Sequence, residues 1–451
     1  MYDVAIVGFG PTGATLANLL GMQGFKVAVV EREPQPSPLP RAVHFDGEVM
    51  RIFETAGLAR EILPRTRPSG GMRYVNTAGT VMIERKPAIG TGPHGWANNY
   101  LFHHADLESV LRAGIERFAN VEVFLGEEAL SVSQSKLETS RREIHAQFIV
   151  GCDGARSLVR QAIGSGHDDL GLHQPWLVVD VLLERDADLP EQTVQYCDPA
   201  RPITFVKVGG RRRRWEIMLM PGDAAEAMTH PQNVWRLLAP WIRPGEAALE
   251  RAAVYTFHSL IARKWRDRRL LIAGDAAHQT PPFLGQGMCA GIRDAANLAW
   301  KFADERLLDT YQSEREPHVR VYIEEALRLG AIIQTTDPEV AAERDRRFLE
   351  GGKEEMVNLS PRLGPGFHHD GEIYPQPVLP DGRRLDEAIG GYRFAVLTGE
   401  KIEIPSDMAL VPFQAKESVV LRPDRYVYGR ARSAAELKSL IGGMRHEPQA
   451  A

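Results

Sequence analysis

Short runs of apolar residues mark four places where the chain is expected to form buried strands. They occupy residues 4–7, 27–30, 148–150 and 270–273 and contain many β-branched side chains. Runs without polar interruption are typical of strands that are buried on both faces of a parallel sheet. Residues 14–22 follow the pattern of a buried helix, so the chain begins with a predicted strand–helix–strand unit.

Further strand patterns follow later in the chain. Residues 176–183 and 215–220 suggest strands of a second sheet, and the tail has shorter strand patterns at 394–397, 418–421 and 426–428. This mixture predicts an α/β protein. A chain of 451 residues is long for one hydrophobic core, so two or three domains are expected.

Glycines at the first strand–helix junction have a spacing suited to a dinucleotide. Gly8, Gly10 and Gly13 form a G-x-G-x-x-G motif, and Glu31 ends the second strand. Gly8 permits the tight turn, Gly10 lets the backbone approach a pyrophosphate, and Gly13 lets the helix pack on the strand. The helix start supplies N–H donors, and Glu31 can accept from ribose hydroxyls. This segment predicts dinucleotide binding without choosing between NAD and FAD.

Two later strands also end in turns with polar residues. The strand at 148–150 leads into Asp153-Gly154 and the basic residue Arg156. The strand at 270–273 leads into Gly274-Asp275, a Pro-Pro bend, a Gly-x-Gly loop and a long helix rich in small residues. A loop followed by a helix start of this kind can hold an anionic group.

These three segments together resemble the signature of the flavin-dependent aromatic hydroxylases of the p-hydroxybenzoate hydroxylase type. In that family the first segment holds the ADP part of FAD, the D-G segment is associated with FAD and the reduced nicotinamide, and the G-D aspartate binds the ribityl chain. The resemblance implies FAD as cofactor and NADH or NADPH as transient reductant. The cofactor-binding positions expected from it are Gly8, Gly10, Pro11, Thr12, Gly13, Glu31, Arg32, Arg41, His104, Asp153, Arg156, Gly274, Asp275, Pro282, Gly285, Gln286, Gly287 and Met288.

A closer resemblance is to the 3-(3-hydroxyphenyl)propionate 2-hydroxylases. Its matching segments are 174–180, 195–199, 213–216, 285–301, 307–315 and 422–426. It implies a monooxygenase that uses NAD(P)H and O2 to hydroxylate 3-(3-hydroxyphenyl)propionate or a similar phenolic acid in aromatic catabolism. His104 departs from that subfamily, which has glutamine there. The alternatives are a tailoring hydroxylase for a polyketide or other larger aromatic, and a non-catalytic carrier that kept the FAD fold. A flavin halogenase is disfavoured, because the chain has no W-x-W-x-I-P motif.

The chemistry implied by this resemblance needs no protein nucleophile. Reduced FAD and O2 give a C4a-hydroperoxide, so the protein must hold the ring and exclude water. The helix that starts near Gly287 is expected to point N–H groups at the flavin pyrimidine. A phenol reacts faster as phenolate, and His44 and Asp46, just before a helix predicted at 47–55, are the catalytic candidates for a proton relay. His278 is a third candidate, for which a structural role is the more ordinary interpretation.

Substrate contacts are expected from the second sheet and the Pro-Pro bend. A propionate tail needs a cation, for which Arg213 and Arg214 are both candidates. The full set of predicted substrate residues is Gln195, Tyr196, Arg213, Trp215 and Pro281.

The resemblance also predicts a domain arrangement. The prediction is a glutathione-reductase-like Rossmann domain for FAD at 1–72, 101–168 and 258–330, an inserted mixed β-sheet substrate domain at 73–100 and 169–257, and a short thioredoxin-like α/β domain at 360–451. No cysteine follows Cys289, so the last domain cannot be redox-active, and an interaction or dimerisation role is expected for it.

Composition limits the partners. The net charge of -5 argues against nucleic acid, and the three cysteines lack metal-ligand or redox spacing, so no metal site is expected. No apolar run reaches the ~18 residues of a membrane span, and the first strand begins by Asp3, which leaves no room for a signal peptide. A cytoplasmic enzyme that takes a small phenolic substrate and O2 is therefore expected, with a homodimer possible.

Overall fold

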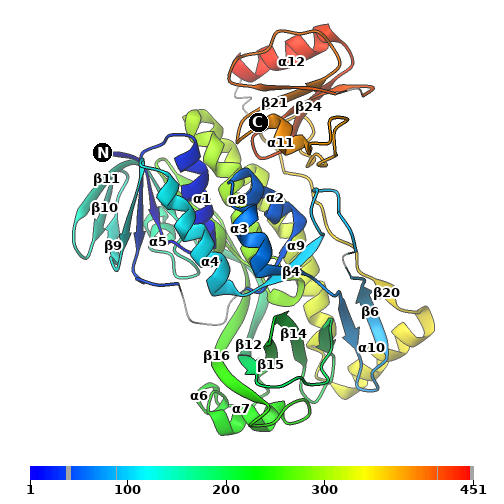
Figure 1. The fold of residues 1–451 in the computed structure, drawn as a ribbon. Helices are drawn as coiled ribbons and strands as arrows, with labels where there is room; N and C mark the ends of the chain where they lie inside the picture. Colours follow the sequence, from blue (N-terminus) through cyan, green and yellow to red (C-terminus); the bar gives the residue numbers. More distant parts are fainter. Residues whose placement is uncertain (37–41, 88, 414, 447–451) are drawn as a thin grey trace.

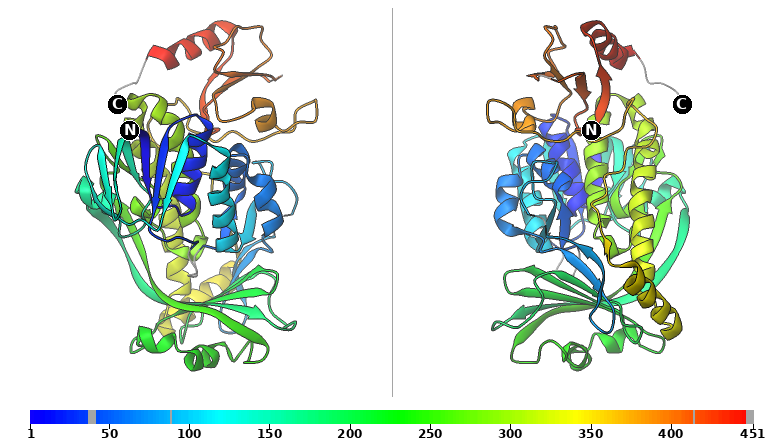
Figure 2. Two further views of the ribbon diagram at one scale, coloured as in Figure 1. Left: turned by 60° about the vertical axis from the view of Figure 1, so that its left-hand side comes forward. Right: turned by 90° about the vertical axis from the view of Figure 1, so that its right-hand side faces the viewer.

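The computed structural model describes residues 1–36, 42–87, 89–413 and 415–446. It has the mixed α/β architecture that the sequence predicts. Figure 1 shows a first unit in the middle, a second sheet below it and a C-terminal unit above it, and Figure 2 shows the same arrangement from two other sides. Among the described residues, none of the helices combines the length and apolar character needed to cross a membrane.

The first unit is built on a largely parallel sheet in the order β17-β18-β11-β1-β2-β8. Its strands are β1 (Tyr2–Val7), β2 (Val27–Glu31), β8 (Val121–Leu125), β11 (Glu143–Gly151), β17 (Arg266–Asp267) and β18 (Leu270–Ile272), with β9 (Ala129–Val132) and β10 (Lys136–Thr139) attached to β11. The four predicted apolar runs lie in neighbouring parallel strands and are buried, as uninterrupted apolar runs require.

Helices cover this sheet and bring distant segments together. The helix α1 (Pro11–Met22) packs closely against α8 (Gly287–Ala299), because a Cβ at Gly291 of α8 would lie only 2.3 Å from Oγ1 of Thr12 of α1. Proline at the first position of α1 suits a helix start, since its missing N–H would be unpaired there. The other helices of this unit are α2 (Gly47–Thr55), α3 (Ala59–Ile62), α4 (His104–Ala113) and α5 (Leu158–Ile163). The bounds of α2 confirm the predicted helix.

The second sheet has nine strands in the order β19-β16-β12-β15-β14-β13-β5-β6-β20. They are β5 (Met72–Val75), β6 (Val81–Arg85), β12 (His167–Leu183), β13 (Thr193–Tyr196), β14 (Ile203–Gly209), β15 (Arg212–Met218), β16 (Ala247–Ala262), β19 (His278–Gln279) and β20 (Glu354–Glu355). The strand predicted at 176–183 lies within β12, and the strand predicted at 215–220 overlaps the end of β15.

Alternation along these strands gives the second sheet two different faces. The outer face carries apolar side chains such as Leu177 and Phe205 and is covered by α6 (Ala225–Met228) and α7 (Pro231–Leu238). The inner face carries Trp176 and Tyr74, which contact Phe283 of the first unit. A small sheet of β3 (His44–Asp46), β4 (Thr66–Pro68) and β7 (Asn99–Phe102) lies at this junction. The helix α9 (Thr310–Ile333) contacts β16 of the second sheet, and α10 (Pro338–Gly351) contacts β6, so both helices run along one side of the molecule (Figure 2).

The C-terminal unit is a four-stranded sheet in the order β22-β21-β23-β24. Its elements are α11 (Leu385–Ile389), β21 (Ala395–Thr398), β22 (Ala409–Pro412), β23 (Ser418–Leu421), β24 (Val427–Ala431) and α12 (Ala434–His446). The three strand patterns predicted in the tail correspond to β21, β23 and β24, with shifts of a few residues at their ends. The thioredoxin-like character of this unit and the predicted domain boundaries stay predictions.

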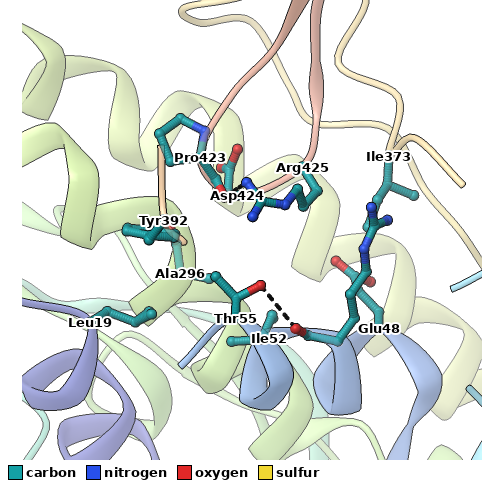
Figure 3. A pocket seen from close by; sticks show the side chains of 11 residues that line it. Leu19, Glu48, Ile52, Thr55, Ala296, Ile373, Tyr392, Pro423, Asp424 and Arg425 are labelled. Carbon is teal, nitrogen blue, oxygen red and sulfur yellow. Dashed lines mark hydrogen bonds between the residues drawn. The ribbon is translucent and has the colours of Figure 1, made fainter. Parts of the chain in front are cut away.

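Buried polar contacts join the C-terminal unit to the first unit. Arg51 on α2 donates from Nε and Nη2 to the carboxylate of Asp386 on α11, at 2.7 and 2.8 Å. Figure 3 shows the small pocket at this contact, where Asp424 and Arg425 of the C-terminal unit approach Glu48 and Thr55 of α2. The charges at this contact are paired, so the C-terminal unit is anchored by specific geometry rather than by apolar burial alone.

Candidate active site

The predicted cofactor segments meet at one edge of the first sheet. Gly8 follows β1, Glu31 ends β2, Asp153 follows β11, and Gly274 follows β18. The four strands are parallel neighbours in the order β18-β11-β1-β2, so their carboxyl ends lie at the same edge. This edge is where α/β folds bind nucleotides.

The turn after β1 is closed on one side and open on the other. A Cβ at Gly8, whose φ is +99°, would lie 2.4 Å from the carbonyl oxygen of Cys152, and a Cβ at Gly13 would lie 2.1 Å from the carbonyl oxygen of Gly8. A Cβ at Gly10 would meet no atom within 4 Å. The turn is therefore packed tightly against the protein at Gly8 and Gly13, while Gly10 leaves space beside the N-terminus of α1, where backbone N–H groups can bind a pyrophosphate.

Glu31 and Arg112 flank this turn. The backbone N–H of Phe9 donates to Oε2 of Glu31 at 2.7 Å, and Nε of Arg112 donates to the carbonyl oxygen of Phe9 at 3.1 Å. Nη1 of Arg112 is buried and has no hydrogen-bond partner in the part of the chain that the structure describes. A guanidinium N–H without an acceptor beside a glycine-rich turn fits a phosphate oxygen. Sequence reasoning missed Arg112, because α4 reaches the turn only through packing against α1.

Asp153 lies at the start of α5. Its Oδ2 accepts the backbone N–H of Leu158 at 2.7 Å, whereas Oδ1 is buried and has no hydrogen-bond partner among the described residues. Burial raises the pKa of Asp153. Arg156, the other cofactor-binding position predicted on this turn, is exposed, and its contact with the cofactor stays a prediction.

Gly274 and Asp275 form the turn after β18. Gly274 has φ +64°, and its N–H donates to Oδ2 of Asp294 at 3.0 Å. Asp275 is exposed at the same sheet edge as Gly8 and Glu31. This placement agrees with the predicted contact to a ribityl hydroxyl, which stays a prediction.

Replacing Asp275 with alanine is expected to weaken FAD binding by about 10-fold or more, because a charged acceptor for a cofactor hydroxyl is lost. Flavin retained per protein, read from the absorbance of the purified enzyme during dilution, measures this. Asp267→Ala is the matched control, since Asp267 lies at the other end of β18 in the register. Equal flavin retention by the two variants would remove Asp275 from the site.

His278 supports this turn from inside the protein. Its Nε2 lies 2.6 Å from Oδ2 of Asp294, and Nε of Arg315 donates to Oδ1 of the same carboxylate at 2.9 Å. The partners His278 and Arg315 lower the pKa of Asp294 to about 2, against the effect of burial. His278 is fully buried in this cluster, which gives it the structural role that the sequence favoured over a relay.

The Pro-Pro bend leads to a tight turn just before the helix that is expected to point at the flavin. Pro281 precedes a short 3-10 helix at Pro282–Leu284, and Gly285 follows with φ +70°. A Cβ at Gly285 would lie 2.9 Å from Nδ1 of His44, so the turn and the strand β3 are in direct contact. The helix α8 starts at Gly287, as predicted.

His44 is buried at this contact and is held from both sides. Its Nδ1 lies 3.2 Å from the carbonyl oxygen of Gly285, and its Nε2 lies 2.8 Å from Oδ1 of Asn99. Burial, followed by the charge of Arg85, lowers the pKa of His44, so the ring is neutral at pH 7. A neutral ring has a single N–H, so it donates to one of these two oxygens and keeps the other ring nitrogen as a proton acceptor.

Asp46 has a structural role and is not suited to the predicted relay. Its carboxylate caps α2 by accepting the backbone N–H of Val49 at 3.1 Å, and its Oδ2 also accepts from Nη2 of Arg293 and from Nε2 of Gln286. Although burial opposes it, the guanidinium of Arg293 lowers the pKa of Asp46 to about 2. A carboxylate this acidic does not take up a proton at neutral pH, so His44 remains as the relay candidate.

The inner face of the second sheet presents a polar row to this turn. Glu216, Thr204, Gln195 and Tyr74 are paired in register across four strands. The hydroxyl of Thr204 donates to Oε1 of Gln195, and the hydroxyl of Tyr74 donates to the carbonyl oxygen of Phe283 at 3.2 Å. Burial raises the pKa of Glu216. The row places hydrogen-bonding groups opposite the bend that carries Pro281.

Three predicted substrate residues lie elsewhere. Tyr196, Arg213 and Trp215 project from the outer face, where Tyr196 and Trp215 pack against Trp241. The structure therefore does not bring them together with Gln195 and Pro281. Their strands were identified correctly, but the alternation along each strand turns these side chains toward α7.

The alternative cation, Arg214, does lie on the inner face. Its Nε and Nη2 donate to Asp180 at 2.7 and 3.0 Å, and Nη2 of Arg251 donates to the same carboxylate at 3.1 Å. Both arginines therefore already have a carboxylate partner. Two other charged residues of this face, the buried Arg85 and the half-buried Glu216, were not predicted as site residues. The signal available in the sequence was a charged residue at the alternate positions that otherwise carry the apolar side chains of one strand face.

The remaining predicted cofactor residues are dispersed around the edge. Arg32 is exposed and paired with Glu33 at 3.4 Å, His104 is buried at the start of α4, and Met288 is half-buried on the first turn of α8. Arg41 lies outside the described residues. These contacts stay predictions.

Comparisons with known proteins agree with this geometry. Residues 1–326 match the family model described as FAD binding domain. A probable NADH-specific resorcinol 4-hydroxylase of Rhodococcus jostii (strain RHA1) is 39% identical, with 97% of this chain and 93% of the relative covered. A 3-(3-hydroxy-phenyl)propionate/3-hydroxycinnamic acid hydroxylase of Burkholderia cenocepacia (strain HI2424) is 34% identical, with 88% of this chain and 79% of the relative covered.

Solved structures share the whole fold. An aklavinone-11 hydroxylase, solved as a ternary complex with FAD and aklavinone, superposes with a TM-score of 0.81 at 22% identity over 98% of both chains. The flavin-dependent monooxygenase PieE, solved with FAD and substrate, has a TM-score of 0.83 at 20% identity over 99% of both chains. At these identities the likeness is one of fold.

Proposed function

Because this chain belongs to the FAD binding domain family and is an FAD-dependent hydroxylase, we propose that it uses NADH and O2 to hydroxylate a small phenol with a second substituent meta to the hydroxyl. Family membership confirms the sequence-based prediction of an FAD-dependent monooxygenase. Resorcinol and 3-(3-hydroxyphenyl)propionate, which the names of the two relatives contain, both have this meta pattern. The preference for NADH rests on the name of the Rhodococcus relative.

The residues at the sheet edge fit FAD. The open side of the turn at Gly10 and the unpartnered Nη1 of Arg112 suit the pyrophosphate, and Glu31 and Asp275 suit hydroxyl groups at either end of the cofactor. When bound, FAD supplies the redox chemistry and the activation of O2. The protein supplies binding, orientation and the surroundings of the reacting phenol.

The single observation that carries the proposal is the contact between His44 and the turn at Gly285. It joins a neutral, buried imidazole to the turn that opens α8, next to the polar inner face of the second sheet. A phenol has a pKa of about 10 in water, so a base near its hydroxyl favours the more reactive phenolate. The ring nitrogen of His44 that carries no hydrogen is the proposed acceptor for that proton.

Aromatic side chains close the other side of this space. Phe283 packs against Trp176 and Phe257 with ring centroids 5.7 and 6.3 Å apart, and Trp176 and Phe257 stack on each other at 5.8 Å. In this proposal the packed rings keep water away from a phenol held beside the bend. Water exclusion limits unproductive loss of the activated oxygen.

Stopped-flow reduction of the FAD-loaded enzyme by NADH tests the proposal. A meta-substituted phenol, either resorcinol or 3-(3-hydroxyphenyl)propionate, is expected to accelerate flavin reduction by about 10-fold or more, equal to about 1.4 kcal/mol of barrier. NADPH should be less effective than NADH at equal concentration. Benzene-1,4-diol and unsubstituted phenol are the matched controls. If no phenol changes the rate of flavin reduction by NADH, the proposed function is wrong.

A further inference from the structure

Arg85 is a buried cation without a partner on the inner face of the second sheet. It is the last residue of β6, and its register pairs it with Met72, two residues before Tyr74 on the same face. The side chain is only 7% exposed, and Nε is buried without a hydrogen-bond acceptor. Over the described ranges, the guanidinium takes part in no hydrogen bond and no ion pair.

This isolation is unusual for a buried charge. A guanidinium that is buried without a partner loses its hydration free energy and gains no hydrogen bond or ion pair in return. Two other arginines of the inner face, Arg214 and Arg251, share the carboxylate of Asp180. The carboxylate within electrostatic reach of Arg85 is that of Asp46, which is already bound by Arg293 at 2.5 Å. The chain therefore holds a positive charge here without supplying its counter-ion.

The guanidinium lies beside the groups that surround the substrate space. Its charge acts on both His44 and Tyr74. His44 touches the turn at Gly285, and Tyr74 donates to the carbonyl oxygen of Phe283 on the same bend. Arg85 therefore lies where a phenol held between His44 and the inner face would place its second substituent.

We propose that Arg85 binds the carboxylate of the substrate, so that the preferred phenols are phenolic acids rather than resorcinol. The proposal rests on the proposed function and names its substrate class. A carboxylate is fully ionised at neutral pH, whereas a phenol hydroxyl is not, so only the acid supplies the permanent charge that a buried guanidinium lacks. The planar guanidinium also matches a carboxylate with two parallel hydrogen bonds.

Binding of two matched ligands to the FAD-loaded enzyme tests the proposal. The dissociation constants of 3-(3-hydroxyphenyl)propionate and of its neutral amide are read from the change in flavin absorbance. The wild-type enzyme should bind the acid at least about 10-fold more tightly than the amide. Arg85→Met should weaken acid binding by about 10- to 150-fold, the range for hydrogen bonds to charged groups, and change amide binding by less than about 3-fold. Arg85→Lys should retain part of the preference for the acid, because lysine keeps the positive charge but lacks the two parallel N–H donors of the guanidinium.

Lys86→Met is the matched control. It removes the same charge one residue away, from a side chain that is 65% exposed and paired with Glu355, and it should leave both constants unchanged. Arg85→Met removes an unpaired buried charge, so its unfolding temperature should not fall, which separates a binding defect from a folding defect.

Several results would overturn the proposal. Equal binding of acid and amide by the wild type would do so, as would a parallel loss of both ligands in Arg85→Met. A loss of resorcinol binding as large as the loss of acid binding would assign Arg85 to a phenolate oxygen, and a loss of FAD would assign it to the cofactor. In each of these cases, acceleration of flavin reduction by phenols would still hold if the proposed function is right, so the two failures can be told apart.

Discussion

Replacing Glu314 with alanine is expected to lower the free energy of unfolding by about 3–5 kcal/mol, because it leaves the buried Lys301 without a carboxylate partner and Arg422 with Asp424 alone. Glu314 lies on α9 with no exposed surface, and its Oε2 accepts from Nζ of Lys301 at 2.8 Å and from Nη2 of Arg422 at 2.9 Å. Its Oε1 accepts the backbone N–H of Phe367 at 2.7 Å. This one carboxylate joins α9, the end of α8 and the C-terminal unit, so its loss should also loosen that unit.

Urea unfolding followed by tryptophan fluorescence measures this effect. Glu316→Ala is the control, since Glu316 lies on the same helix and pairs with Arg320 near the surface, where such pairs contribute at most about 1 kcal/mol. The neighbouring cations lower the pKa of Glu314 below that of an ordinary glutamate, against the effect of burial. Its contribution is therefore present above about pH 4 and is lost as the pH falls further. Equal stability of the two variants at pH 7 would contradict the prediction.

The sequence was sufficient for those parts of the site that depend on local backbone geometry. Gly8, Gly13 and Gly274 occupy turns that admit no Cβ or require a positive φ, and such positions leave a glycine in a recognisable context. The uninterrupted apolar strands beside them identify a parallel sheet, and parallel strands place the turns that follow them at one edge. The family resemblance implied that these segments share one cofactor, and the parallel sheet shows how their turns meet at one edge.

Side chains on the second sheet could not be assigned in this way. Alternation shows that Gln195 and Tyr196 must face opposite sides and that Arg213 and Trp215 share a side, but both faces of this sheet are buried. Hydrophobicity then does not tell which face meets the first unit. That choice depends on α7 covering one face and Phe283 contacting the other, which are tertiary contacts.

Long-range partners decide the roles of charged residues as well. Asp46 and His44 were both predicted as candidates for the proton relay. In the fold, Arg293 from the middle of α8 binds Asp46 and makes it a permanent anion. Arg85 is the reverse case, since nothing in its local sequence distinguishes a paired from an unpaired buried arginine.

Replacing Arg293 with methionine is expected to cost about 3–5 kcal/mol of unfolding free energy at pH 7, because two buried carboxylates lose their common partner. Nη2 of Arg293 donates to Asp46 at 2.5 Å, and Nε donates to Glu48 at 2.6 Å. Nη1 donates to Oε1 of Gln286, the residue just before α8. The variant should therefore lose both stability and flavin affinity, since the same side chain holds the turn that is proposed to face the ring.

The pH dependence distinguishes this charge effect from loss of packing. In the wild type, the pKa of Asp46 is lowered to about 2 from an ordinary value of 3.8, so the stability from this shift is present above pH 4 and is lost between about pH 4 and 2. In the variant, the unpaired carboxylates are easier to protonate, so the difference in stability between the two proteins should shrink as the pH falls through this range. The triple variant Arg293→Met, Asp46→Asn, Glu48→Gln should recover much of the stability at pH 7, because it leaves no buried charge unpaired. A stability difference that is constant from pH 7 to pH 3, together with no recovery in the triple variant, would show that Arg293 acts through packing alone.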